Sequence, residues 1–312
     1  MRFLNRLKVI WQVLKQSGSE FIDDKVLKLS AALSYYTIFS IAPMLIIIIF
    51  LCDLFLSQES IEGSIYTQIR SMVGDEATIQ IQSMIKNASL SGDVSWATIV
   101  GVVTLVIGAT GVFAEIQDSI NFIWKLKAKP KKSGILKMIL NRLLSFSLVI
   151  SMGFILLVSL ALNGVMEVLN HRLLSVFPEI EYFTLYVANL AITFLVITSL
   201  FAIIFKVLPD ARIRWKDVLV GAIATAVLFM IGKFAIGYYL GASKVSSAYG
   251  AAGSIVIILL WVYYSAAILY FGAVFTRVWV QHFGSRIYPN DYAIWMREVE
   301  VVSTQNPTTL ND

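Results

Sequence analysis

Six apolar segments, each long enough to cross a lipid bilayer as a helix, dominate this sequence. A transmembrane helix needs about 20 mainly apolar residues. The segments run over 29–52, 94–113, 143–168, 183–205, 218–240 and 250–279. No stretch has the sustained alternation of apolar and polar residues that marks a β-barrel. The sequence therefore predicts an all-α, polytopic membrane protein with six transmembrane helices.

The composition excludes several other classes of protein. Of 312 residues, 58% are hydrophobic and 14% are charged, whereas soluble domains are about 45–50% apolar and about 25% charged. A soluble enzyme and a disordered chain are both excluded. The single cysteine, Cys52, excludes an intramolecular disulfide. The two histidines lack a Cys/His cluster around them, so we expect neither a zinc site nor a cofactor.

The Lys and Arg residues are distributed unevenly between the two sides of the predicted bundle. Six spans place both termini on one side, which carries most of the 25 cations. Cytoplasmic loops are enriched in Lys and Arg, so we expect both termini to be cytoplasmic. This distribution explains the net charge of +5 without a nucleic-acid partner. The basic loop over 125–142 also lacks the aromatic residues that would stack on bases.

The spans divide the chain into three regions. Residues 1–28 are predicted to form a cytoplasmic amphipathic helix, 29–280 the six-helix transmembrane domain, and 281–312 a cytoplasmic C-terminal tail. The connection over 53–93 has apolar residues at helical spacing and is predicted to form an external helical loop.

The N-terminal helix has an apolar stripe flanked by cations. The stripe contains Leu4, Leu7, Trp11 and Leu14. This pattern suits an interfacial helix that lies on an anionic membrane surface. An ordinary helix docked on the protein is the alternative.

One charged residue lies well inside a predicted span. Lys233 falls in the outer half of the fifth segment. An ionisable residue in a membrane is a functional candidate because its burial is costly. On a transport path, its ammonium would face the bundle interior and meet an anionic group. Alternatively, its stem snorkels toward the outer interface.

Polar and aromatic groups on other spans are further candidates for a substrate pathway between spans one, five and six. Ser34 and Thr37 lie on one face of the first span, and Pro43 interrupts its hydrogen-bond ladder. Protein or water must satisfy the carbonyl that is freed there, which makes this span a candidate pathway helix. A structural kink with no role in transport is an equal alternative. Tyr263 and Tyr264 lie deep enough in the sixth span to line a cavity.

A polar group follows the second span. Gln117, Asp118 and Asn121 share one side of the helical extension predicted there. They are candidates for a polar gate with Lys125 or with the turn over 212–214. A solvated helix end is the alternative.

Three sets of motifs resemble a known family. The first comprises Ala-Ala-Leu-Ser-Tyr-Tyr over 31–36 and Ser-Ile-Ala-Pro over 40–43, and the second comprises Asn121 and Trp124. The third includes the glycine-rich run over 249–254 and the aromatic run over 260–265. Together they resemble the YihY/BrkB family of integral membrane proteins, formerly labelled ribonuclease BN.

The resemblance implies a multi-pass protein of the bacterial inner membrane that takes part in transport or envelope lipid homeostasis. We therefore expect a transporter-like or lipid-handling protein for an anionic or amphipathic substrate, with membrane lipids as partners. A non-transporting structural or assembly protein is the alternative, and oligomer formation stays open. Ala267 and Val274 replace the Gln and Glu that are usual in the family, which weakens any inference of a site there.

We expect no ribonuclease activity and no other enzymatic activity. Metal-assisted RNA hydrolysis needs clustered ligands around an ion, whereas His171 and His282 are predicted on opposite sides of the membrane. A metal-free mechanism would instead need a paired general acid and base in a water-filled cleft. Apart from the acids of the loops, only Glu115 and Asp118 are close carboxylates near a span end.

The predicted orientation can be tested by cysteine labelling in a Cys52→Ser background. Asp75→Cys should react with a membrane-impermeant maleimide in intact cells, because residue 75 belongs to the predicted external loop. Pro130→Cys should react only after permeabilisation. The opposite labelling pattern would refute the assignment of the termini to the cytoplasm.

Overall fold

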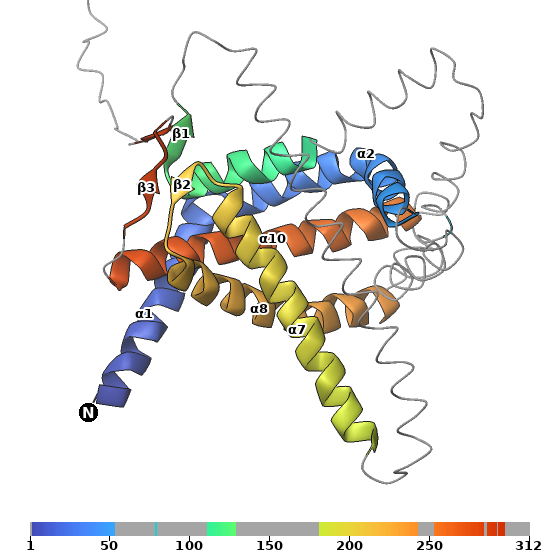
Figure 1. The fold of residues 1–312 in the computed structure, drawn as a ribbon, viewed down its shortest axis with the longest axis horizontal. Coiled ribbons are helices and arrows are strands. Elements are labelled where there is room, and N and C mark those ends of the chain that lie inside the picture. The colour runs from blue at the N-terminus through green and yellow to red at the C-terminus, as the bar shows by residue number, and fades with distance from the viewer. Residues whose placement is uncertain are drawn as a thin grey trace, which may run out of the picture.

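The computed structural model describes residues 2–53, 79, 111–128, 181–242, 253–283, 286–291 and 293–296. These residues are mainly helical (Figure 1). The helices are α1 (Arg2–Asp23), α2 (Val26–Asp53), α7 (Glu181–Val207), α8 (Trp215–Ala242) and α10 (Gly253–His282). A further helical stretch covers 111–123. The short strands are β1 (Leu126–Ala128), β2 (Ala211–Arg212), β3 (Tyr288–Pro289) and β4 (Ala293–Trp295).

Within these described residues, three helical stretches are long and apolar enough to cross a membrane. They are Leu190–Val207 in α7, Trp215–Ile236 in α8 and Ile255–His282 in α10. α2 extends over the first predicted span. The polytopic, mainly helical architecture is thus confirmed. The third predicted span, the external loop and most of the second span lie outside the described residues, so the number of six spans stays a prediction.

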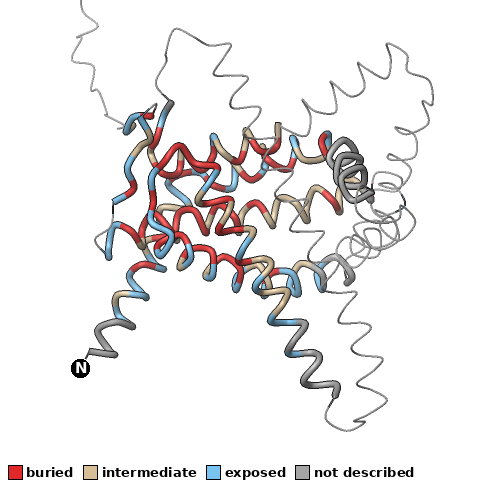
Figure 2. Tube along the Cα trace, in the orientation of Figure 1, coloured by how far each residue is buried: buried red, intermediate tan, exposed pale blue. Residues whose placement is uncertain are grey.

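α10 is the central helix of the described bundle. It contacts α2 on one side and α8 on another, and α7 packs across α8 (Figure 1). Buried residues concentrate where α10, α8 and α7 meet the helix over 111–123 (Figure 2). We call the end of the bundle at which α1 meets α2, α7 meets α8 and α10 ends the junction end.

Two glycine–threonine pairs hold α8 and α10 close together. A Cβ atom at Gly272 would overlap the Thr225 hydroxyl, and one at Gly221 would overlap the Thr276 hydroxyl. Each threonine hydroxyl donates to the carbonyl four residues earlier, at 2.7 Å. Both hydroxyls are therefore satisfied within their own helices, and the missing side chains let the two backbones approach closely.

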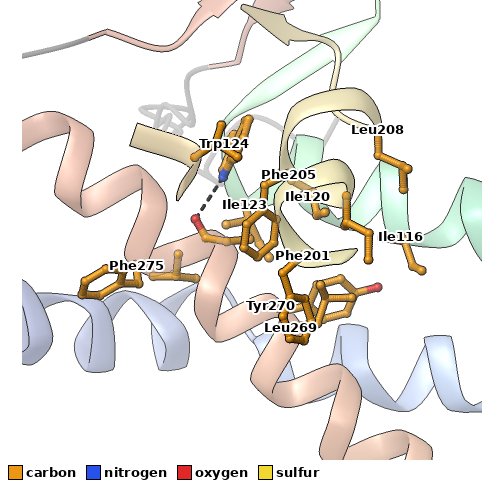
Figure 3. Packing of buried hydrophobic residues seen from close by; sticks show 14 of the residues in the cluster. Ile116, Ile120, Ile123, Trp124, Phe201, Phe205, Leu208, Leu269, Tyr270 and Phe275 are labelled. Carbon is orange, nitrogen blue, oxygen red and sulfur yellow. Dashed lines mark hydrogen bonds between the residues drawn. The ribbon is translucent and has the colours of Figure 1, made fainter. Parts of the chain in front are cut away.

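Aromatic side chains pack between α7, α8 and α10. The Phe201 ring on α7 meets that of Phe229 on α8 edge to face at 5.8 Å, and Phe229 meets Trp261 on α10 at 6.0 Å. Trp124 is buried, and its Nε1 donates to the Ala273 carbonyl of α10 at 3.0 Å (Figure 3). This bond joins the end of the helix over 111–123 to the central helix.

α1 combines features of both alternatives considered from its sequence. Val13 and Ser17 are buried, and the Phe21 ring lies 5.9 Å from that of Phe271 on α10. One side of α1 is therefore docked on the protein. Trp11 and Ile22 nevertheless keep 69% and 74% of their surface exposed, so a second apolar side remains uncovered.

The region predicted as a C-terminal tail folds back onto the junction end. β4 pairs antiparallel with β1, and β3 pairs antiparallel with β2. The prediction of an exclusively α-helical fold was wrong in this detail. Strands of two or three residues are too short to show the alternation of apolar and polar residues that predicts a strand, and their partners are distant in sequence.

The close packing of α8 and α10 predicts that Gly272→Ala destabilises the protein. The new methyl group must displace Thr225, and overpacking of this kind costs about 1–3 kcal/mol. Thermal unfolding of the purified protein should therefore shift to lower temperature, and adding Thr225→Ala should restore part of the loss. Gly18→Ala on α1 is the matched control, since its Cβ meets no atom within 4 Å. Equal unfolding temperatures for Gly272→Ala and Gly18→Ala would contradict the prediction.

Candidate functional site

A buried arginine organises the junction end of the bundle. Arg277, near the end of α10, keeps only 6% of its surface exposed. Its guanidinium donates to the carboxylates of Glu20 and Asp24, the latter at 2.8 Å, and to the Ile123 carbonyl. Asp24 also accepts from Lys125 Nζ at 2.7 Å. The buried positive charge is thus compensated, as burial of an ion requires.

Lys125 adopts a backbone conformation that is unusual for a residue with a side chain. Its φ of 56° lies in the left-handed region, which costs a non-glycine residue on the order of 1–3 kcal/mol. The ion pair with Asp24 and the Phe122 ring, 5.1 Å from Nζ, hold the side chain. The Lys125 carbonyl accepts from the Met296 amide at 2.8 Å. Residues kept in such conformations cluster at functional sites.

A cavity of about 700 Å³ opens beside this charge network. Its lining combines three cations, two acids, two tryptophans, two aliphatic side chains and the amide of Gln281. These are Lys125, Arg277 and Arg286, Glu20 and Asp24, Trp124 and Trp295, and Val280 and Ile287. The Nε of Arg277 is buried and has no hydrogen-bond partner among the described residues. The cavity therefore offers donors and positive charge next to apolar surface.

A second polar cluster lies around Asp210, in the turn between α7 and β2. The Asp210 carboxylate accepts from Gln117 Nε2 at 3.0 Å and from Asn121 Nδ2 at 3.1 Å. The Asp210 amide donates to Asn121 Oδ1 at 2.8 Å. We call Glu115, Gln117, Asp118, Asn121 and Asp210 the acid–amide cluster.

Two carboxyl groups of this cluster hold their protons more tightly than usual. Desolvation raises the pKa of Asp118, and the nearby Asp210 carboxylate raises it further. Desolvation also raises the pKa of Glu115, Asp118 adds to the increase, and a hydrogen bond from Ser119 opposes it. Burial and like charges both disfavour the ionised form.

The structure brings together part of the polar group predicted after the second span. Asn121 is buried and bonded to Asp210, whereas Asp118 is exposed on the same helix. Gln117 and Asn121 bind Asp210 rather than the basic side chains of the turn over 212–214, and their role as a gate stays a prediction. Arg212 instead pairs with Asp291, and Arg214 pairs with Asp217. A fully solvated helix end is therefore wrong for Asn121.

The other candidates from the sequence are distributed over α2, α8 and α10. Ser34 and Thr37 on α2 donate to the carbonyls of Ser30 and Leu33. α2 continues as a helix through Pro43, whose side chain lies outside the described residues.

The tyrosines and the lysine lie on the two neighbouring helices. Tyr263 and Tyr264 are half-buried on α10, and the Tyr264 ring packs where Gly232 of α8 leaves space. Lys233 is exposed on α8 and does not face the described core. The role of these residues in a substrate pathway stays a prediction.

Sequence reasoning missed the charge network and its cavity. In the sequence, nothing distinguishes Arg277 from the other cations that are assigned to the cytoplasmic side. A signal was present, because Glu20 and Asp24 are four residues apart and so share a helical face. Their partner is more than 250 residues away, so its identity needed the tertiary structure. This cavity lies at the junction end, and a substrate pathway between spans one, five and six stays a prediction.

The positions of the usual family Gln and Glu lie on the central helix. Val274 is fully buried in the hydrophobic core, and Ala267 is half-buried. An apolar side chain at residue 274 is thus consistent with its surroundings.

Comparison with known proteins identifies relatives over most of the chain. UPF0761 membrane proteins of Saccharophagus degradans and Pseudomonas aeruginosa are each 28% identical to it, over 262 and 256 residues. That of Paraburkholderia xenovorans is 26% identical over 269 residues. The matches cover 81–83% of this chain but only 57–59% of the relatives, so the chain spans less than two thirds of their length. No solved structure matches the chain.

Residues 18–291 match the family described as virulence factor BrkB. The match confirms the resemblance predicted from the motifs, and it includes both the charge network and the acid–amide cluster. Since it covers most of the sequence, the chain belongs to the virulence factor BrkB family of multi-pass membrane proteins.

Proposed function

We propose that this protein handles an anionic amphiphile, a lipid with an anionic headgroup, at the junction end of its helix bundle. The cavity beside Arg277 carries the proposal. We assign the site to the cytoplasmic side of the bacterial inner membrane, in keeping with the distribution of Lys and Arg in the sequence.

The size and lining of the cavity suit such a ligand. Ligand cavities commonly enclose about 300–1,000 Å³, and this one encloses about 700 Å³. Trp124 and Trp295 provide apolar surface with a polar edge, and Val280 and Ile287 add aliphatic surface. A lipid headgroup with the start of its acyl chains needs this combination of charge and apolar contact.

The charges of the cavity favour an anion. Glu20 and Asp24 neutralise Arg277 and Lys125, so Arg286 supplies a positive charge in excess of the two acids. Arg286 is exposed and thus accessible to an incoming headgroup. The guanidinium fork binds phosphate oxygens with two parallel donors.

α1 provides a route between the cavity and the membrane surface. It supplies Glu20 to the cavity wall, while Trp11 and Ile22 expose apolar surface on the same helix. An amphipathic helix of this kind lies at the boundary between headgroups and acyl chains. A lipid could therefore reach the cavity along α1 without crossing the bundle.

The proposal predicts that Arg286→Gln reduces the retention of anionic lipid. Hydrogen bonds to charged groups contribute about 1.5–3 kcal/mol, and solvent exposure lowers this to roughly a three- to tenfold loss of binding. Native mass spectrometry of protein purified with phosphatidylglycerol and phosphatidylethanolamine measures the retention of each. Arg212→Gln is the matched control, because this exposed arginine pairs with Asp291 outside the cavity.

Two further arms separate the alternatives. Competition by inorganic phosphate would show that the site recognises a free anion rather than a lipid. Lys233→Met tests the pathway hypothesis for that lysine separately and, from its exposed position, should leave retention unchanged. Equal retention in Arg286→Gln and Arg212→Gln would refute the proposed site and favour the non-transporting assembly protein.

A further inference from the structure

We propose that the segment carrying β3 and β4 forms a strap that closes the junction-end cavity over its ligand and limits the rate at which the ligand exchanges. The segment comprises residues 286–291 and 293–296, and we call it the C-terminal strap. This role rests on the anionic-lipid site proposed above and concerns access to that same cavity.

The C-terminal strap supplies one wall of the cavity. Arg286, Ile287 and Trp295 line it, and they contribute an exposed cation, an aliphatic side chain and one of the two tryptophans. Among the described residues of the strap, only Ile287 and Ala293 are buried, and Trp295 keeps 52% of its surface exposed. A ligand in the cavity would therefore contact the strap directly, through the charge of Arg286 and the apolar surface of Trp295.

The opposite walls of the cavity are held in place by buried charge. The Arg277 guanidinium on α10 donates to Glu20 of α1, to Asp24 of the α1–α2 turn and to the carbonyl of Ile123. Displacing one partner of a buried ion pair leaves an uncompensated charge, which strongly destabilises a protein. These walls should therefore keep their positions when a ligand enters or leaves.

The contacts that hold the C-terminal strap are short and lie at the surface. β4 pairs with the three residues of β1, and β3 pairs with the two residues of β2. The Met296 amide donates to the Lys125 carbonyl at 2.8 Å. The ion pair between Arg212 and Asp291 is exposed, and exposed pairs contribute little stability. Segments with few buried side chains open without unfolding of the whole protein, so the strap is the wall that can open at the lowest cost.

β1 belongs to the fixed part of the cavity rather than to the strap. Trp124, just before it, is buried and donates to the Ala273 carbonyl of α10. Lys125 pairs with Asp24, and Leu126 keeps only 3% of its surface exposed. Opening of the strap therefore separates β4 from β1 and leaves β1 on the bundle.

A disulfide between β1 and β4 tests the strap directly. Lys127 faces Ile294 in the pairing, both residues are exposed, and neither lines the cavity. Facing residues of antiparallel strands have Cα atoms about 4.5–5.5 Å apart, a separation that a disulfide can span. In a Cys52→Ser background, the double variant Lys127→Cys/Ile294→Cys can thus be locked by oxidation and released by a thiol reductant.

The measured quantity is the rate at which bound phosphatidylglycerol exchanges for its deuterated form, followed by native mass spectrometry. The double variant is loaded with phosphatidylglycerol before oxidation. The disulfide should then slow exchange by roughly tenfold or more, and reduction should restore the rate of the Cys52→Ser parent. Each single cysteine variant, given the same oxidant, is the matched control and should exchange at the parent rate. Equal rates for the oxidised and reduced double variant would overturn the proposal.

Amide hydrogen exchange gives a second measurement, which needs no cross-link. A ligand that contacts the strap binds the closed state better and so increases its population. Phosphatidylglycerol should therefore slow exchange of the amides over 293–296 relative to phosphatidylethanolamine, and Arg286→Gln should abolish this difference. Equal exchange of these amides in the two lipids would also count against the strap.

The outcomes distinguish a failure of the strap from a failure of the site. Normal retention of phosphatidylglycerol, combined with an exchange rate that the disulfide leaves unchanged, would overturn the role of the strap alone. Absence of retention in the Cys52→Ser parent would refute the proposed function and, with it, the role of the strap.

Discussion

The arrangement of the junction end depends on how the positive charge of Arg277 is buried. An isolated guanidinium in a protein interior is strongly destabilising, and removing one partner of a buried pair typically costs about 3–5 kcal/mol. Glu20, Asp24 and the Ile123 carbonyl surround this charge. These partners come from α1, the α1–α2 turn and the helix over 111–123. A single electrostatic requirement therefore holds three separate parts of the chain against α10.

The cavity and the acid–amide cluster both depend on the helix over 111–123, because its Ile123 carbonyl accepts from Arg277 and its Asn121 binds Asp210. Tyr270 and Arg277 are seven residues apart on α10 and so lie on one face, two turns from each other. Asp118 and Lys125 have the same separation along the chain. The packing of the helix over 111–123 against α10 therefore positions groups of both features.

Close packing of the helices fixes the position of α10 against its neighbours. Gly221 and Gly272 let α8 approach α10 until each backbone meets a threonine of the other helix. Trp124 fastens the helix over 111–123 to α10 through one buried hydrogen bond (Figure 3). Densely packed interiors transmit displacement rather than absorb it. A side chain at Gly221 or Gly272 would therefore disturb the packing that positions α10 and, with it, Arg277.

The sequence by itself determined the membrane class, the helical architecture, the approximate extent of α2, α7, α8 and α10, and the family. These properties depend on local signals, namely the length of apolar runs, helical periodicity and short motifs. It also indicated that Asp118 and Asn121 belong to a polar group, since they share a helix. Only the tertiary structure decided that Asn121 binds Asp210, that Arg277 pairs with Glu20 and Asp24, and that β3 and β4 return to the junction end. Each of these contacts joins residues about 80 or more positions apart. No local pattern specifies such a partner, because it is selected by the way the helices pack.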